Sequence, residues 1–111
     1  MSSHYAEYIK EKDGIDTIES RKGFITYKYL DDGKTVYIFD CFVKPEYRGN
    51  KLCLSFVEAV ESKAKQKGYT TNLTSVQLSI PKASRNILTY MGYGYEIINA
   101  KDGIVYLSKS I

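Results

Sequence analysis

Residues 43–56 read VKPEYRGNKLCLSF and join two segments with different hydrophobic patterns. The segment before them, TVYIFDCFV (35–43), has apolar residues on both faces of an extended chain, which predicts a central strand covered on both sides. After them, apolar residues recur every fourth position from Leu52 to Ala64, which predicts an amphipathic helix over 51–67. The quoted stretch is therefore a strand-to-helix junction.

The rest of the chain divides into short strands and one further helix. The alternating pattern of GFITYKYL and the turn DDGK (31–34) predict a β-hairpin with the strand described above. Residues 5–19 fit either a third strand or a short helix followed by a strand. The other predicted elements are strands at 23–30, 72–80, 93–100 and 104–111, and a helix at 82–92.

Length and charge restrict the class of protein. A chain of 111 residues fits one domain, here 1–111. With 16 Lys and Arg against 13 Asp and Glu, the net charge is only +3, and the charges are mixed along the chain. A nucleic-acid binder is expected to show a concentrated basic stripe, so the charge argues against one. The 11 tyrosines suit half-buried strands; a base-stacking platform is the sharper alternative.

The cysteines and the single histidine argue against a metal site. Cys41 and Cys53 lie in apolar patterns with no zinc-type spacing, and His4 is the only histidine. Both thiols are expected to be small core residues in a reducing compartment. We find no secretory-type apolar run and no segment that approaches a membrane span. These observations predict a cytoplasmic protein without a bound metal.

The turn between the predicted strand and helix has the local features of an anion site. It lies at the amino end of the helix, where unpaired N–H groups and the helix dipole favour phosphate. Gly49 permits close approach of the backbone, and Arg48 and Lys51 add positive charge. Any strand–turn–helix offers free N–H groups, however, so a plain turn is the alternative.

The wider context resembles a known family. VxPEYRG (43–49) before a helix, after a β-hairpin in a short mixed chain, resembles the coenzyme A-binding core of GNAT-type N-acetyltransferases. The ending SRNILTYMGY (84–93) is similar to the family's later helix, and the resemblance covers 23–111. It implies an α/β fold of the mixed α+β kind, with a central, mostly antiparallel sheet, a β-α-β core and helices on both faces.

The resemblance also implies cofactor-binding residues for acetyl-CoA. Main-chain groups of Phe42 and Val43 would lie beside the pantetheine arm. Ser84 and Asn86 would contact the other side of the cofactor. The backbone N–H groups that would hold the pyrophosphate belong to Arg48, Gly49, Asn50, Lys51, Leu52 and Cys53.

The loop departs from the family pattern at two positions. The family pattern begins with Arg or Gln and continues with any two residues, Gly, any one residue, and Gly or Ala. When Arg48 is taken as its first residue, Lys51 and Cys53 occupy the two small-residue positions. The Lys51 ammonium could replace close backbone contact by charge or could block the pocket, and Cys53 is small enough to fit.

Asp40 and Tyr90 are the candidate catalytic residues. Asp40 is the one carboxylate of the central strand and, by the resemblance, a candidate base; a structural pairing with Lys or a backbone N–H is the alternative. The family places a tyrosine acid four residues before a Gly-aromatic pair. If Gly94-Tyr95 is taken as that pair, Tyr90 occupies the position of the acid. If Gly92-Tyr93 is taken as the pair, Tyr90 lies outside that position and is a surface tyrosine. The second alignment is favoured by the helix's predicted apolar face of Ser84, Ile87, Leu88 and Met91.

The leading prediction is an N-acetyltransferase that transfers acetyl from acetyl-CoA to a primary amine by direct attack. The acceptor is an amine of a small molecule or of a protein. The alternative is a catalytically impaired GNAT-like binding or interaction module, which the departures at Lys51 and Cys53 favour.

Overall fold

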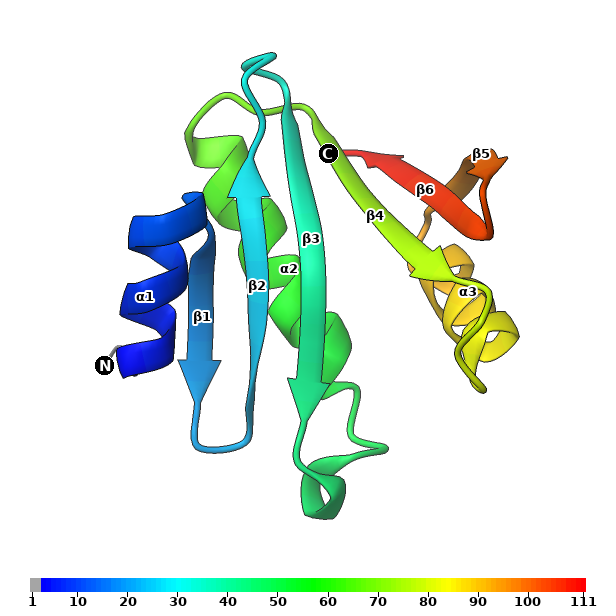
Figure 1. The fold of residues 1–111 in the computed structure, drawn as a ribbon, viewed down its shortest axis with the longest axis horizontal. Coiled ribbons are helices and arrows are strands. Elements are labelled where there is room, and N and C mark those ends of the chain that lie inside the picture. The colour runs from blue at the N-terminus through cyan, green and yellow to red at the C-terminus, as the bar shows by residue number, and fades with distance from the viewer. Residues whose placement is uncertain (1–2) are drawn as a thin grey trace.

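The computed structural model describes residues 3–111 (Figure 1). All strands of the described residues join one six-stranded sheet of order β1-β2-β3-β4-β6-β5. The elements are α1 (His4–Asp13), β1 (Asp16–Ser20), β2 (Gly23–Tyr29), β3 (Thr35–Val43), a 3-10 turn (Pro45–Tyr47), α2 (Leu52–Gln66), β4 (Thr71–Gln77), α3 (Ala83–Gly92), β5 (Glu96–Lys101) and β6 (Ile104–Ser110).

Only the β3–β4 pair of this sheet is parallel. Helix α2 provides the crossover between these strands and lies behind β2 and β3 in Figure 1. Helix α1 lies at the β1 end of the sheet. There the backbone N–H of Ser3 donates to the side chain of Glu19. Because neighbouring residues of a strand point to opposite faces, Glu19 lies on the face opposite to that of the core residue Ile18. The predicted mixed, mostly antiparallel fold with helices on both faces is confirmed.

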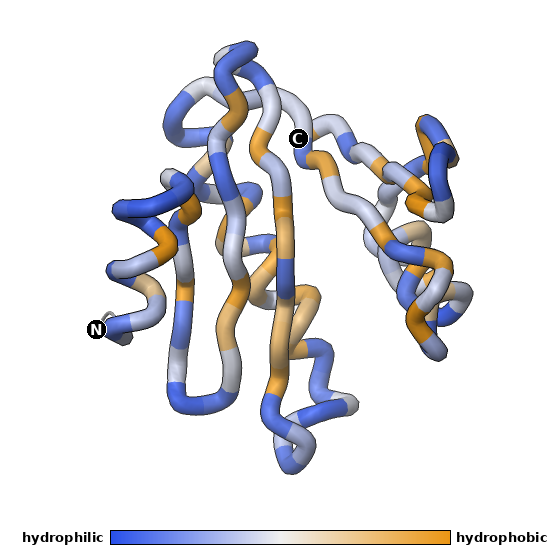
Figure 2. Tube along the Cα trace, viewed as in Figure 1, coloured by the Kyte–Doolittle hydropathy of each residue, from blue (hydrophilic) through white to orange (hydrophobic). Residues whose placement is uncertain are grey.

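The core forms where α2 packs on the sheet. The predicted stripe of α2 is buried at Phe56, Val60 and Ala64, and it packs with Val36 and Ile38 of β3. Burying each of the larger side chains, Phe56, Val60, Val36 and Ile38, contributes about 1.5–3 kcal/mol. Figure 2 shows β3 as the most continuous hydrophobic strand of the sheet. The helical spacing and the hairpin pattern therefore predicted this part of the fold correctly.

The structure decides or corrects the sequence-based element boundaries. Residues 5–19 take the second alternative, a short helix followed by a strand. The strand predicted at 72–80 ends at Gln77, where the chain turns back and the Leu78 N–H donates to the Gly103 carbonyl. The strand predicted at 93–100 begins only at Glu96, because residues 93–95 form the C-terminal cap of α3.

The extension beyond α3 has a clear hydrogen-bonding cause. The N–H of Gly94 donates to the Met91 carbonyl, and that of Tyr95 donates to the Tyr90 carbonyl. Gly94 has φ +99°, a conformation open to glycine at little cost. This cap places Tyr95, only 2% exposed, in the core instead of at the start of a strand.

Candidate active site

The two parallel strands separate halfway along their length. β3 continues to Val43 and β4 to Gln77, but their pairing ends at Ile38 and Thr74. The Thr74 hydroxyl donates to the Ile38 carbonyl at 3.3 Å and so occupies the carbonyl at the point where the ladder stops. Beyond this point the two strands leave a cleft between them.

A β-bulge in β3 accounts for the separation. Thr26 of β2 faces Asp40, but the next residue of β2, Tyr27, faces Ile38, so Phe39 has no partner. The Asp40 N–H donates to the Thr26 hydroxyl at 3.1 Å. A bulge bends its strand and increases the local twist, and this one lies immediately after the last β3–β4 pair.

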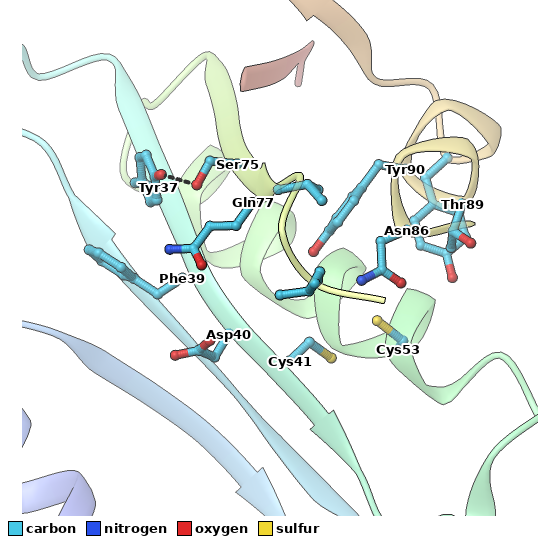
Figure 3. A pocket seen from close by; sticks show the side chains of 13 residues that line it. Tyr37, Phe39, Asp40, Cys41, Cys53, Ser75, Gln77, Asn86, Thr89 and Tyr90 are labelled. Carbon is cyan, nitrogen blue, oxygen red and sulfur yellow. Dashed lines mark hydrogen bonds between the residues drawn. The ribbon is translucent and has the colours of Figure 1, made fainter. Parts of the chain in front are cut away.

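The cleft has a volume of about 500 Å³ and is lined from both faces of the sheet (Figure 3). Tyr37 and Phe39 alternate with buried β3 residues and therefore belong to the face away from α2. Cys41 and Tyr90 line it from the face of the sheet that α2 covers. Because the strands have separated, the cleft connects the two faces. Its lining residues are Tyr37, Phe39, Asp40, Cys41, Cys53, Ser75, Val76, Gln77, Ile80, Asn86, Thr89, Tyr90 and Tyr93.

The loop after β3 is braced by the side chain of Arg48. The Arg48 Nε–H donates to the Val43 carbonyl at 2.9 Å, and the guanidinium lies 5.8 Å from the centre of the Phe42 ring. These contacts hold the loop against the end of β3. The Arg48 side chain was predicted only to add positive charge to the turn, so its bracing contacts with Val43 and Phe42 were missed.

The amino end of α2 begins at Lys51, the N-cap residue, which has φ +56°. No side chain in the described part of the chain, residues 3–111, caps the helix. The first helical bond runs from the Ser55 N–H to the Lys51 carbonyl, at 3.1 Å. The N–H groups of Leu52, Cys53 and Leu54 precede that bond and are free to hold an anion. The loop therefore has the local geometry of a phosphate site.

Asp40 lies in the cleft but is not buried. β3 was predicted to be covered on both sides; this is wrong for its second half, where Phe39, Asp40 and Phe42 are exposed because the strand has left β4. Neither of the two ion pairs among residues 3–111 includes Asp40. Figure 3 shows its carboxylate on the same cleft as Tyr90.

Tyr90 also lines the cleft, so its interpretation as a surface tyrosine is wrong. Its ring packs edge-to-face on Tyr95, with 5.2 Å between centroids, and on Tyr93 at 6.3 Å. Burial raises the pKa of Tyr90 to about 12. The hydroxyl therefore stays protonated at neutral pH and can serve as a proton donor.

The predicted apolar face of α3 is correct only at Ile87, which packs on the core. Leu88 is 68% exposed and Met91 is 44% exposed. Ala83 and Tyr90 pack on the core beside Ile87 in their place. The helix is rotated because its cap buries Tyr95, and this brings Tyr90 inward.

The remaining predicted residues are distributed around the cleft. Asn86 lines it, whereas Ser84 is exposed and does not. Val43 and Leu52 pack partly against the core. The loop residues between them, Gly49, Asn50 and Lys51, are exposed.

Several lining residues were missed by the sequence analysis. Tyr37 and Ser75 are joined by a hydrogen bond between their hydroxyls, which ties the outer face of β3 to β4 just before the strands separate. Gln77 and Thr89 also line the cleft. Ser75 and Gln77 follow the last β3–β4 pair and Thr89 lies on α3, and the sequence does not mark where the pairing ends.

The sequence matches the acetyltransferase (GNAT) family over residues 6–93. The chain belongs to this family. The match spans most of the chain, including the loop and both helices that border the cleft. The family predicted from the 43–56 stretch is thus confirmed.

Solved structures of family members share the fold. The PaiA N-acetyltransferase of Thermoplasma acidophilum, in complex with coenzyme A, is 18% identical with a TM-score of 0.75, over 95% of this chain and 67% of that chain. A GNAT acetyltransferase of Elizabethkingia anophelis with acetyl-CoA bound is 15% identical with a TM-score of 0.75, over 95% and 82%.

A ribosomal-protein alanine N-acetyltransferase of Escherichia coli is 15% identical with a TM-score of 0.71, over 99% of this chain and 77% of that chain. At these identities the similarity establishes the fold. No curated protein sequence matches the chain. Among residues 3–111, no helix has the length and apolar character needed to cross a membrane.

Proposed function

We propose that the protein is an N-acetyltransferase that transfers the acetyl group of acetyl-CoA to a primary amine. The observation that carries this proposal is the cleft between β3 and β4, which Asp40 and Tyr90 line together. A cleft lined from both faces gives an acyl donor and an amine separate entrances to one reaction centre. The thioester of acetyl-CoA supplies an activated acetyl group.

The cofactor is proposed to lie along the helical side of the cleft. The free N–H groups of Leu52, Cys53 and Leu54 would bind the pyrophosphate, with the positive end of the α2 dipole adding to the attraction. The Lys51 ammonium, exposed at the same helix end, would add a charge-assisted contact. Asn86 would contact the cofactor from α3, across the cleft.

Asp40 and Tyr90 have complementary proposed roles. Asp40, exposed in the cleft, would accept a proton from the incoming ammonium, either directly or through water. Tyr90, whose hydroxyl is protonated at neutral pH, would donate a proton to the departing thiolate. General acid and base groups of this kind contribute about 10²–10⁴-fold each to rate.

The acceptor is proposed to be an amine of a protein or peptide. The E. coli relative acts on an alanine of a ribosomal protein, which makes peptide α-amines the first choice. A panel of candidate acceptors should therefore include peptides beginning with Ala, peptides with internal Lys, and small amines.

The test combines calorimetry with acetyl-CoA and a transfer assay over this panel. We expect binding by the wild type, and a loss of turnover on the order of 10²-fold in Asp40→Asn and Tyr90→Phe with cofactor affinity retained. No binding at millimolar acetyl-CoA would overturn the proposal. Unchanged turnover in either variant would remove that residue from the mechanism.

The second candidate is a binding module without catalysis. Lys51 and Cys53, at positions where the family pattern has small residues, are the observation that favours it. Cofactor binding with no transfer to any amine of the panel would support this module.

A further inference from the structure

The cleft contains the two cysteines of the chain, and they face each other. Cys41 lies on β3 just beyond the bulge, and Cys53 lies in the first turn of α2. Both are half-buried, free thiols that line the cleft. Figure 3 shows their sulfur atoms pointing toward one another across the gap between strand and helix.

The two thiols differ in acidity in a way that suits oxidation. A hydrogen bond with Cys41 lowers the pKa of Cys53, which also lies at the positive end of α2. The pKa of Cys41 is raised by the same hydrogen bond and by burial. Cys53 is thus the more acidic of the two thiols, and Cys41 is the less acidic thiol that faces it across the cleft.

The segment between the cysteines is the proposed phosphate loop. Residues 42–52 contain the 3-10 turn, the Arg48 brace and the N-cap Lys51. A bond between the two sulfurs would close a covalent ring around this loop. In a disulfide the sulfurs are about 2.05 Å apart and the Cα atoms about 4.4–6.8 Å apart, so the bond would tie the first turn of α2 to β3.

We propose that Cys41 and Cys53 are an oxidisable pair whose disulfide closes the cleft to acetyl-CoA. The bond can form without any cofactor, whereas its effect on acetyl-CoA rests on the proposed function. The helix N–H groups that would hold the pyrophosphate belong to the turn that the bond would tie to β3.

The proposed oxidant is a peroxide, with hydrogen peroxide as the example. The Cys53 thiolate attacks one peroxide oxygen, the O–O bond breaks, and hydroxide leaves, so that Cys53 becomes a sulfenic acid. The Cys41 sulfur then attacks the Cys53 sulfur, loses its proton, and displaces the oxygen as water. The two thiols give up two electrons in total, and peroxide is reduced to water.

The first measurement maps the bond in the full chain. The protein is treated with hydrogen peroxide and then blocked with a maleimide, and its intact mass is recorded. Trypsin sites at Arg48 and Lys51 separate the cysteines, so a disulfide appears as cross-linked peptides that dithiothreitol releases. We expect both thiols to disappear together, with loss of two hydrogen atoms and no dimer. Independent oxidation, or two thiols that stay reactive in the treated protein, would overturn the proposal.

Cys41→Ser and Cys53→Ser are the matched controls. Cys41→Ser should accumulate the sulfenic acid or a mixed disulfide at Cys53, and Cys53→Ser should leave Cys41 largely reduced. Equal reactivity of the two remaining thiols would contradict the assigned roles. If a serine variant does not fold, as judged by its thermal transition, the alanine variant replaces it.

The second measurement is calorimetry with acetyl-CoA on reduced, oxidised and re-reduced protein. We expect affinity to fall about tenfold or more on oxidation and to return on reduction, with no such change in Cys41→Ser. Equal affinity before and after a mapped disulfide would overturn the closure of the cleft. Absence of binding by the reduced protein would instead overturn the proposed function, while the mapped bond would stand.

Discussion

Lys51 is the residue that departs furthest from ordinary backbone geometry in the candidate site. Apart from Asp102, it is the only described non-glycine residue with a positive φ. The family pattern has glycine at this position, and the structure supplies a backbone reason: the left-handed conformation that starts α2. The chain has kept this conformation while carrying a side chain, which costs about 1–2 kcal/mol relative to the ordinary helical region.

We expect Lys51→Gly to be more stable than Lys51→Ala by about 1 kcal/mol, because both variants lose the ammonium and only glycine loses the strain. Urea denaturation of the two variants measures this difference. Calorimetry on the same pair separates charge from backbone: weaker acetyl-CoA binding in both variants means that the ammonium helps. Equal stabilities would contradict the strain at Lys51.

Tyr95 carries a different kind of cost. Its hydroxyl is buried and has no hydrogen-bond partner among residues 3–111. Tyr95→Phe removes this unpaired group while leaving the ring in place, so we expect the free energy of unfolding to rise by about 1 kcal/mol. Tyr93→Phe, at a half-buried ring nearby, is the control and should change stability by less than about 0.5 kcal/mol. A less stable Tyr95→Phe protein would show that the hydroxyl has a partner.

At the scale of elements, hydrophobic patterns in the sequence predicted correctly those strands and helices whose formation depends on local interactions. The β2–β3 hairpin and α2 followed from alternation and from the four-residue stripe ending at Ala64. The bulge at Phe39 did not, because it is a property of how β2 pairs with β3, and no residue type in TVYIFDCFV requires it. Tyr90 was misplaced because apolar spacing was given more weight than the cap that continues α3 to Tyr95.

Gly23 tests how closely β2 must approach the end of β3. A Cβ at this position would lie 2.0 Å from the Phe42 carbonyl oxygen, whereas one at Gly92 would have no atom within 4 Å. We expect Gly23→Ala to lose about 1–3 kcal/mol of stability because backbone must move, and Gly92→Ala to be neutral or slightly stabilising. Thermal unfolding measures both, and similar effects in the two variants would argue against the close approach.

At the scale of the whole molecule, the buried tyrosines make stability depend on alkaline pH. Burial raises the pKa of Tyr27 and of Tyr90 to about 12 and also raises that of Tyr95, whereas an unfolded chain ionises tyrosine near pH 10. Above about pH 10 the unfolded chain loses protons that the folded protein keeps, so unfolding becomes easier. The stabilisation by these groups is complete below about pH 10 and is lost as the pH rises through about 12.

Urea midpoints recorded from pH 8 to 12 should therefore fall in the upper part of that range, and Tyr27→Phe should fall less steeply. A flat profile between pH 10 and 12 would contradict the raised pKa values.

A cleft that passes between the two faces of the sheet also has a kinetic consequence. Residues of both faces line it, so the acyl donor and the amine need not share an entrance, and neither must depart before the other arrives. Initial-velocity plots at several fixed donor concentrations should give intersecting lines, and desulfo-CoA should inhibit competitively against acetyl-CoA alone. Parallel lines would mean that the acetyl group is first transferred to the protein. Direct transfer between two substrates bound at the same time does not need such an acetylated protein intermediate.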